Sequence, residues 1–332
     1  MIKPKTGILL TQIGTPDALT VKGVRQYLKK FLSDPRVIEV PRMIWWPILH
    51  GFILRVRPKR SLKLYQEIWT DEGSPLLIYS ENIRRKLEEQ LQIPVRLGMH
   101  YSNPSIADAL SLLKGANQII VLPLFPQYSG TTTASSFDAV NHTLKKWRIY
   151  PDIRTISAYH DHPEYIQAIV NSIQHSWDKN GKGEHLLFSY HGIPESYSKK
   201  GDPYAGLCQK TTELIVKALS LKNEEWSIAF QSRIGKTKWV EPYTDQVFHD
   251  LGKKGVSHLQ VICPGFATDC LETLEEINIR GRKQFQSAGG KTFHYIPALN
   301  DSNAHIDMLI NILKKINWSS CHPERSEGSV YV

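Results

Sequence analysis

Apolar runs alternate with amphipathic stretches along most of the chain. Eight runs are short enough to be single strands, four in each half: GILLTQIG, VRLGMHYS, QIIVLPLF and IRTISAY, then HLLFSYHG, SIAFQSR, HLQVICPGF and TFHYIPA. Continuous apolar runs separated by helical patterns indicate parallel strands that are covered on both faces. The pattern therefore predicts an open α/β sheet, or two of them.

The stretches between these runs carry helix signals. SENIRRKLEEQL is expected to begin with a serine cap at Ser80, and HPEYIQAIVNSIQHSW has a proline near its first turn. TTELIVKAL and HIDMLINILKKI are the clearest of the remaining helices.

The two sets of four runs resemble each other in order and in ending. TQIGTP matches SYHGIP, and LPLFPQYS matches CPGFATD. We therefore predict two similar α/β halves, residues 1–180 and 181–318, joined near the polar, glycine-rich DKNGKGE at 178–184. Ligands of doubly wound sheets bind beyond the carboxyl ends of the strands, so the expected site is a cleft between the halves.

The first half contains extra sequence between its first and second strands. That connection takes roughly 80 residues, against about 40 in the second half. The surplus lies around a lip at residues 41–63, which combines Trp45, Trp46 and large aliphatic residues with a basic run. The basic residues are Arg55, Arg57, Lys59, Arg60 and Lys63. Tryptophan beside such a run favours an exposed surface that lies on a membrane or over a flat apolar ligand. The alternative is a core helix with a solvated basic end.

The composition is that of an ordinary globular protein, with 332 residues of which 41% are hydrophobic and 22% charged. No apolar stretch reaches the roughly 18–20 residues that span a bilayer. The N-terminal stretch MIKPKTGILLTQIGTPD leads into a turn, so it is predicted to contain a strand rather than a signal peptide. We therefore expect a cytoplasmic protein.

The net charge of +9 could suggest a nucleic-acid partner, but Lys and Arg are spread along the chain and form no known binding motif. Attraction to anionic lipid or to an acidic small ligand explains the charge as well. The four cysteines, Cys208, Cys263, Cys270 and Cys321, form no C-x-x-C pair. Reduced thiols are therefore expected, with neither a structural zinc nor an iron–sulfur cluster.

His191 is the first candidate for chemistry. It lies where an apolar strand gives way to Gly-Ile-Pro, at the end of the sheet that faces the expected cleft. A neutral imidazole there can bind a divalent metal or accept a proton near pH 7.

Acidic residues that follow the third strand of the second half are the expected counterpart. Asp269, Glu272, Glu276 and Arg280 recur at three- or four-residue spacing, which places them on one face of a helix. Glu272 would lie in the first turn, where the helix dipole favours a carboxylate. The alternative is a solvated acidic face.

A histidine and a carboxylate without a nucleophilic Ser or Cys motif indicate metal or proton chemistry. GTPD lacks the Gly-Lys-Ser/Thr of a phosphate loop, and the Gly-Lys-Thr in SRIGKTKW lacks the upstream glycine. No G-x-G-x-x-G follows a strand, which argues against a nicotinamide enzyme.

The sequence resembles the ferrochelatases, enzymes that insert ferrous iron into a porphyrin in the last step of protoheme synthesis. The matching stretches are LLTQIGTPDA, FLSDPRV, WWPIL, LPLFPQYSGTT, LLFSYHGIPESY, FQSRIGKTKWVEPYTD and CPGFATDCLETLEEI. They follow the family's order from about residue 6 to 317, and the bacterial members are most similar. The resemblance implies two Rossmann-like halves, each with a parallel four-stranded sheet flanked by helices, and a porphyrin held in the cleft between them.

By this resemblance His191 and Glu272 are the catalytic pair, which face each other across the macrocycle and are also candidate metal ligands. Whether His191 mainly takes pyrrole protons or binds the incoming iron stays open. Glu276 matches a further acidic position on an iron or proton path. Weaker contacts with the porphyrin are implied for Arg57, Tyr65, Ser74, Tyr101 and Tyr128, whose guanidinium and hydroxyl groups suit propionates.

The sequence departs from the family pattern in two places. Members acting on coproporphyrin carry tyrosine where this chain has Ile13, which favours protoporphyrin IX as the substrate, with Fe²⁺ as the metal. The tail at residues 319–332 has no recognised counterpart and is expected to be disordered. No permanently bound cofactor is expected. The alternatives are a non-catalytic heme or metal carrier, a cobalt chelatase for another tetrapyrrole, and a membrane-surface scaffold.

Overall fold

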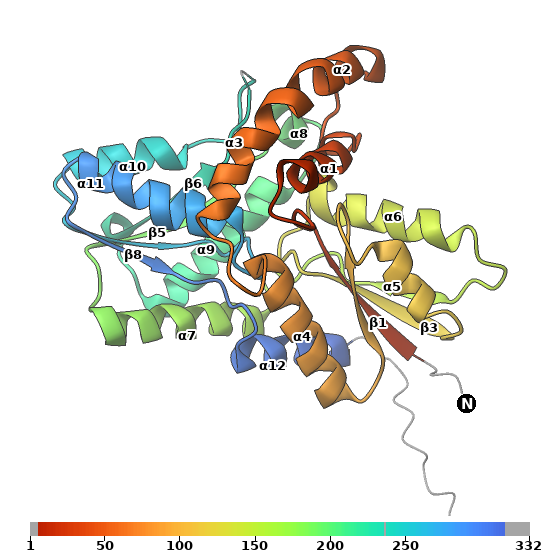
Figure 1. The fold of residues 1–332 in the computed structure, drawn as a ribbon. Coiled ribbons are helices and arrows are strands. Elements are labelled where there is room, and N and C mark those ends of the chain that lie inside the picture. The colour runs from red at the N-terminus through yellow and green to blue at the C-terminus, as the bar shows by residue number, and fades with distance from the viewer. Residues whose placement is uncertain (1–5, 236, 316–332) are drawn as a thin grey trace, which may run out of the picture.

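The computed structural model describes residues 6–235 and 237–315, which form two α/β halves (Figure 1). All eight predicted strands are present: β1 Thr6–Gln12, β2 Val95–Met99, β3 Gln118–Pro123, β4 Asp152–Thr155, β5 His185–His191, β6 Trp226–Gln231, β7 His258–Ile262 and β8 Thr292–Ile296. They build two four-stranded sheets with the orders β2-β1-β3-β4 and β6-β5-β7-β8, and every pair is parallel. This confirms the predicted fold class.

Helices cover both sheets. The N-terminal half contains α1 Val21–Leu32, α2 Arg42–Ile48, α3 Leu54–Gln66, α4 Pro75–Leu91, α5 Ile106–Leu112, α6 Ser135–Leu144 and α7 Pro163–Asn180, with the π-helices η1 Leu49–Ile53 and η2 Gly130–Ala134. The C-terminal half contains α8 Glu195–Lys199, α9 Tyr204–Leu219, α10 Thr244–Lys253, α11 Arg282–Ser287 and α12 Asn303–Lys315, with the 3₁₀ helix η3 Asn223–Glu225 and the π-helix η4 Glu272–Gly281.

One predicted helix start was wrong. Helix α4 begins at Pro75, with Ser74 as its extended cap residue, so the predicted capping residue Ser80 lies inside the helix and is buried. Proline suits the first helical position because its missing N–H needs no partner there. The same rule gave the correct start of α7 at Pro163.

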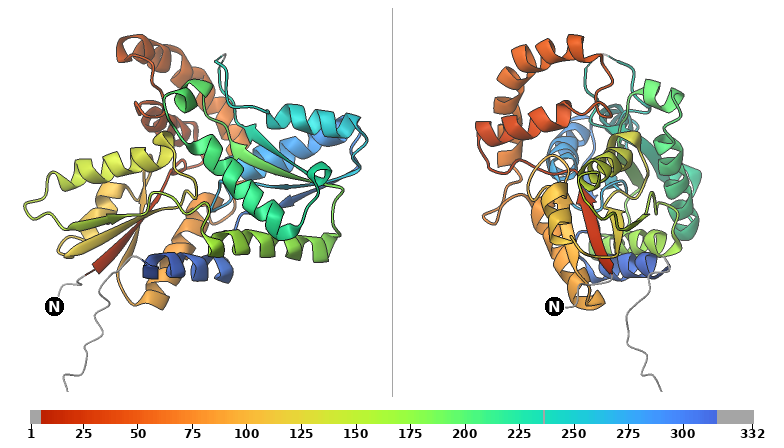
Figure 2. Two further views of the ribbon diagram at one scale, coloured as in Figure 1. Left: turned by 180° about the vertical axis from the view of Figure 1, so that it is seen from behind. Right: turned by 90° about the vertical axis from the view of Figure 1, so that its right-hand side faces the viewer.

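The two halves share one hydrophobic core. Leu10 and Leu122 of the first sheet belong to the same buried cluster as Phe188 and Ile262 of the second. Helices also cross between the halves, because α7 packs on α9 and β8 whereas α12 packs on both α7 and α4 (Figure 2). Residues 181–184 join α7 to β5, within the predicted polar segment. The boundary at residue 180 stays a prediction, and the predicted tail at 319–332 lies outside the described residues.

The lip consists of α2, η1 and most of α3, and it projects from the rest of the molecule (Figure 1). Its two tryptophans differ, because the Trp45 indole donates to the Leu32 carbonyl at 2.7 Å whereas Trp46 is exposed. Helix α2 has no buried residue, and the side chains of Met43 and Phe52 are 91% and 66% exposed. These residues therefore form an exposed apolar surface and not a core helix. None of the helices in the described part of the chain is both long and apolar enough to cross a membrane.

Candidate active site

His191 is the last residue of β5, an inner strand of the C-terminal sheet. Its ring is half-buried, and Nδ1 lies 2.6 Å from the carbonyl oxygen of Gly192. A carbonyl can only accept a hydrogen bond, so Nδ1 carries the proton. In the neutral ring this leaves Nε2 with its lone pair available for a metal or a proton.

Gln231 connects His191 to Glu272. It stands opposite His191 in the β5–β6 register, and its carbonyl accepts from the Gly192 backbone at 2.8 Å. Its side-chain amide donates to the carbonyl of Glu272 at 2.7 Å, and its Oε1 accepts from the Ser189 hydroxyl at 2.7 Å. Gln231 is only 3% exposed. One buried side chain therefore fixes the end of β5 and the start of η4 relative to each other.

The acidic segment forms a π-helix, η4, and Glu272 is its first residue. Burial raises the pKa of Glu276, and the Glu272 carboxylate adds to this rise. A hydrogen bond from Ser232 and the charge of Arg280 lower the same pKa in part, and the nearby His191 acts in the same direction. Glu276 therefore lies within electrostatic reach of both members of the predicted pair.

Asp269 does not belong to this acidic face, contrary to the prediction. It is buried before η4 begins, and its carboxylate accepts from Thr273 at 2.8 Å, Tyr295 at 2.6 Å and Asn300 at 2.7 Å. These bonds tie η4 to β8 and the loop that follows, so Asp269 stabilises the fold. A residue ahead of the helix does not follow the periodicity of the helix.

Helix α3 brings Arg57, which is in the lip, and Tyr65, which lies just after the lip, to the same region. Residues of α1 and α3 pack against Leu271 and Leu274 at the start of η4. Burial lowers the pKa of Arg57, and the negative charge of Glu272 opposes this shift. Arg57 forms no salt bridge within residues 6–235 and 237–315. It is thus a partly buried cation beside a catalytic candidate.

Comparison with known proteins shows the family of the chain. The family model described as Ferrochelatase matches residues 5–316. The chain belongs to the ferrochelatase family. The ferrochelatase of Nitrosococcus oceani is 48% identical over 94% of this chain and 86% of that protein. Those of Methylococcus capsulatus and Vibrio cholerae are also 48% identical, over 93% of this chain and 96% and 98% of theirs.

Two solved structures of low sequence identity show the same fold. SirB from Bacillus subtilis with Fe³⁺ superposes with a TM-score of 0.57 at 11% identity and covers 94% of this chain and 95% of that one. CbiX, the terminal enzyme for biosynthesis of siroheme in denitrifying bacteria, gives a TM-score of 0.51 at 12% identity and covers 94% and 99%. At this identity the likeness concerns the fold alone.

Three further residues implied by the ferrochelatase resemblance lie elsewhere in the N-terminal half. Ser74 is buried and accepts from the Thr15 hydroxyl at 2.8 Å, close to the turn after β1. Tyr101 is buried, and its hydroxyl donates to Asp34 at 2.7 Å. Tyr128 is half-buried just before η2. Among the described contacts none joins these three to His191 or Glu272, so their role stays a prediction.

Tyr27 of α1, a neighbour of Arg57, was missed by the sequence reasoning. So were Gln231 and Ser232, the second of which has a left-handed backbone with φ at +65°. The only signal in the sequence was a polar pair at the end of an apolar strand, within a ferrochelatase-like stretch.

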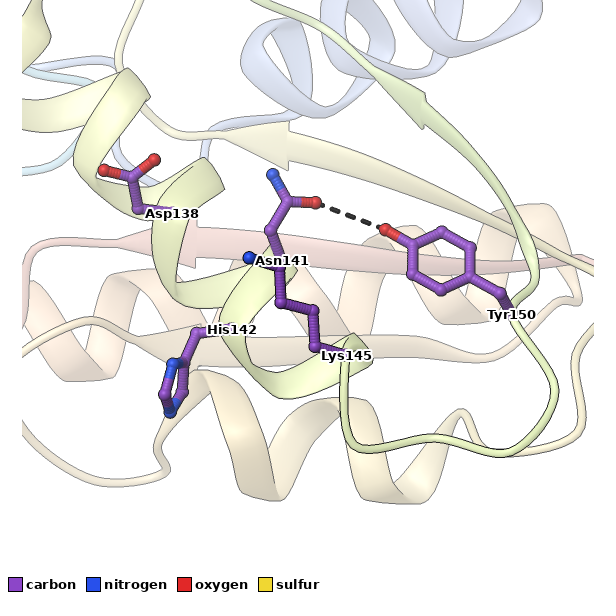
Figure 3. A pocket seen from close by; sticks show the side chains of 5 residues that line it. All are labelled: Asp138, Asn141, His142, Lys145 and Tyr150. Atoms are coloured by element: carbon purple, nitrogen blue, oxygen red, sulfur yellow. Dashed lines mark hydrogen bonds between the residues drawn. The ribbon is translucent and has the colours of Figure 1, made fainter.

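Two concavities of the described residues lie far from each other. One of about 460 Å³ lies on α6 and the loop after it, far from η4, and is lined by Asp138, Asn141, His142, Lys145 and Tyr150 (Figures 1 and 3). The other, of about 160 Å³, lies beside Glu276 and Arg280. Within the described residues no three His, Cys, Asp or Glu side chains are grouped to hold a metal ion. Cys208, Cys263 and Cys270 are buried and free, whereas Cys321 lies outside those residues.

Proposed function

We propose that this protein inserts Fe²⁺ into protoporphyrin IX, forming protoheme and releasing two protons. The observation that carries the proposal is that Gln231 binds both the backbone next to His191 and the backbone carbonyl of Glu272, in a chain of the ferrochelatase family. The reaction makes the protein a lyase of heme biosynthesis.

Two N–H groups block the centre of a planar porphyrin. A bent macrocycle tilts its nitrogen lone pairs outward, towards an entering metal, and contacts remote from the centre supply the energy for bending. The Nε2 lone pair of His191 can take one pyrrole proton or present the iron. The Glu272 carboxylate can take a proton or bind Fe²⁺ in turn. Both residues are thus assigned to both roles.

We assign the binding of the porphyrin propionates to the side of the site that faces the lip. Arg57 is a partly buried cation without an ion pair among the described residues, and an incoming carboxylate would restore its charge balance. Its neighbours Tyr65 and Tyr27 supply hydroxyl groups. Tyr27 was not predicted. Ser74, Tyr101 and Tyr128 are kept as weaker candidates, and Tyr101 already uses its proton to bind Asp34.

Stoichiometry separates the enzyme from a carrier. The purified protein is incubated anaerobically with Fe²⁺ and excess protoporphyrin IX, and the loss of free-porphyrin fluorescence is followed. A ferrochelatase converts many equivalents of porphyrin, whereas a heme or metal carrier stops near one. A preference for Co²⁺ and a more acidic tetrapyrrole would instead favour the cobalt chelatase. Ile13 supports protoporphyrin over coproporphyrin, and no resident cofactor is proposed.

We propose that the protein is cytoplasmic and that its lip makes peripheral contact with a membrane. Met43 and Phe52 are exposed apolar residues next to a basic run, a combination that favours the surface of an anionic bilayer.

We expect substitutions of the exposed apolar residues in the lip to weaken membrane binding. Met43→Ser with Phe52→Ser should weaken binding to anionic vesicles by about tenfold or more, because each large apolar side chain contributes about 1.5–3 kcal/mol on burial. Cosedimentation measures this. Leu112→Ser with Ile149→Ser is the matched control, since these side chains are 68% and 83% exposed outside the lip. Equal losses in the two variants would contradict a role for the lip.

A further inference from the structure

A short segment after His191 leaves the C-terminal sheet and reaches the N-terminal half. It comprises residues 192–202, contains α8 and ends just before α9. Backbone hydrogen bonds hold its first part, because the Gly192 N–H donates to β6 at 2.8 Å and the Glu195 N–H donates to the Lys238 carbonyl at 3.0 Å. The start of the segment is therefore fixed in relation to His191.

Tyr197, on α8, reaches the chain just before the lip. Its hydroxyl donates to the Val37 carbonyl at 3.0 Å and accepts from the Glu39 N–H at 3.3 Å. The Lys200 ammonium pairs with the carboxylate of the same Glu39, but this pair is exposed and contributes little. The half-buried Tyr197 hydroxyl, which serves both as donor and as acceptor, is thus the specific contact with the base of the lip.

Asp202 lies at the N-termini of two helices, one in each half. Its Oδ2 accepts from the Ser129 hydroxyl at 2.9 Å and from the Gly130 N–H at 2.8 Å, where η2 begins. Its Oδ1 accepts from the Tyr204 N–H at 3.0 Å, where α9 begins. A carboxylate is favourable at both places, because the free N–H groups and the dipole of a helix attract negative charge. The Asp202 N–H also donates to the Tyr197 carbonyl at 3.1 Å, which links the two contacts between the halves.

These two contacts adjoin residues of the N-terminal half that are candidates for porphyrin binding. Tyr128 directly precedes the start of η2, which Asp202 caps. Arg57 lies on the lip, whose base is held by Tyr197. One continuous segment thus connects His191 to both places from which the N-terminal half would contact a porphyrin.

We propose that residues 192–202 form a clamp that fixes the porphyrin contacts of the N-terminal half in position relative to His191. Tyr197 and Asp202 are the positioning residues of this clamp, since they hold the lip base and η2 without contacting the reacting atoms. The inference rests on the proposed function and concerns where the macrocycle is held. A site that is ordered in advance binds its ligand more tightly, and a small misplacement of the reacting groups lowers the rate.

Porphyrin binding without iron tests the clamp independently of turnover. Tyr197→Phe removes only a hydroxyl, and Asp202→Asn removes the charge and one of the oxygen acceptors. Each should weaken the binding of protoporphyrin IX by about three- to tenfold in a fluorescence titration, because one or two hydrogen bonds between the halves are lost. Tyr150→Phe and Asp152→Asn are the matched controls, since both side chains form their hydrogen bonds within the N-terminal half. An equal loss of affinity in the controls, or none in the clamp variants, would overturn the proposal.

Two further measurements distinguish positioning from a general loss of stability. In resonance Raman spectra of bound protoporphyrin IX, the out-of-plane modes should weaken in the clamp variants, because a macrocycle that is held less firmly relaxes towards planarity. The value of kcat should fall by about threefold or more with an unchanged pH profile, since no group assigned to proton transfer is altered. A lower melting temperature with wild-type porphyrin affinity, Raman spectrum and kcat would show a purely structural role and overturn the proposal.

The two clamp variants also protect the test against misfolding. If Asp202→Asn does not fold, Tyr197→Phe still decides the outcome, because it leaves both helix caps in place. Failure of the proposed function would appear differently, as a wild type that binds protoporphyrin IX but does not insert iron, and the effect of the clamp on binding would still be measured.

Discussion

The two halves of the molecule share one plan down to single hydrogen bonds. In each sheet the first strand of that half occupies the second position. The third strand of the half lies directly beside it. After the second strand of each half, a proline carbonyl returns to that strand: Pro104 accepts from Met99 at 2.6 Å, and Pro242 accepts from Phe230 at 2.8 Å. A π-helix follows the third strand in both, η2 in one and η4 in the other.

The halves differ at the positions where chemistry is possible. At the end of the first strand, the N-terminal half has Ile13, which packs against the core, and the C-terminal half has His191. The π-helix η2 reads GTTTA and has no charge, whereas η4 carries Glu272, Glu275 and Glu276. The lip, in turn, belongs to the N-terminal half alone.

The comparison teaches that equivalent scaffolds carry separate tasks. One half supplies His191 and Glu272, to which we assign the handling of protons and metal, and the other supplies the lip with its cation Arg57 and its apolar surface. Because residues of η4 pack against α1 and α3, the candidate groups of the C-terminal half lie against the lip side of the N-terminal half.

The strongest test of this division replaces the paired residues Ile13 and His191. His191→Ala should lower iron insertion by about 10²- to 10⁴-fold, since it removes the group assigned to proton and metal transfer. Porphyrin binding, followed by fluorescence titration, should persist. Ile13→Ala should lower turnover far less, because Ile13 contributes packing. Similar losses of kcat in both variants would show that the halves do not divide the work.

The fold could be predicted because buried parallel strands leave continuous apolar runs in the sequence. All eight runs formed strands, and the Gly-x-Pro endings disclosed the duplication. The start of α4 was missed because Pro75 follows a glycine and a serine and resembles a turn, while Ser80 resembles a cap. The choice between them depends on which residues the core buries.

The site could be predicted only in part. His191 and Glu272 stand at the ends of elements, so residue type and position together indicated chemistry. Gln231 acts through its pairing across strands, and Ser232 acts through its left-handed backbone. Neither the pairing nor the backbone conformation can be inferred from residue type. The separation of Asp269 from the acidic face also depends on where η4 begins.

The next test compares two buried glutamines, one in each half. Gln231→Leu should lower kcat by about tenfold and the free energy of unfolding by about 1–3 kcal/mol, because the Glu272 carbonyl and Ser189 hydroxyl lose their partner. Gln12, 4% exposed at the end of β1, donates to Thr268 across the halves at a longer 3.4 Å. Gln12→Leu should retain turnover. Kinetics and denaturant unfolding measure both. An equal loss of kcat in the two variants would contradict a positioning role for Gln231.

The smallest expected effect concerns a polar network found in the N-terminal half. Asp34, next to the start of the lip, accepts from Tyr101 at 2.7 Å and from Ser135, and lies 3.2 Å from Nε2 of His100. Burial alone would raise the pKa of Asp34, but the hydrogen bonds from His100, Ser135 and Tyr101 outweigh it and lower that pKa. The ionised carboxylate is thus the form that the fold prefers.

Asp34→Asn should therefore lower the free energy of unfolding by about 1–2 kcal/mol at pH 7 and leave kcat nearly unchanged. Because the pKa of Asp34 is lower in the folded protein than its unfolded value near 4, the ionised carboxylate stabilises the fold above about pH 4. This contribution is lost as the pH falls below that value and through the folded pKa. The difference between wild type and Asp34→Asn, measured by denaturant unfolding at several pH values, should accordingly shrink below about pH 4. Asp138→Asn is the control, because Asp138 pairs with Arg36 at the surface and should contribute less than about 1 kcal/mol. If Asp34→Asn instead lowered kcat as much as Gln231→Leu, the N-terminal half would take part in the chemistry and the division between the halves would fail.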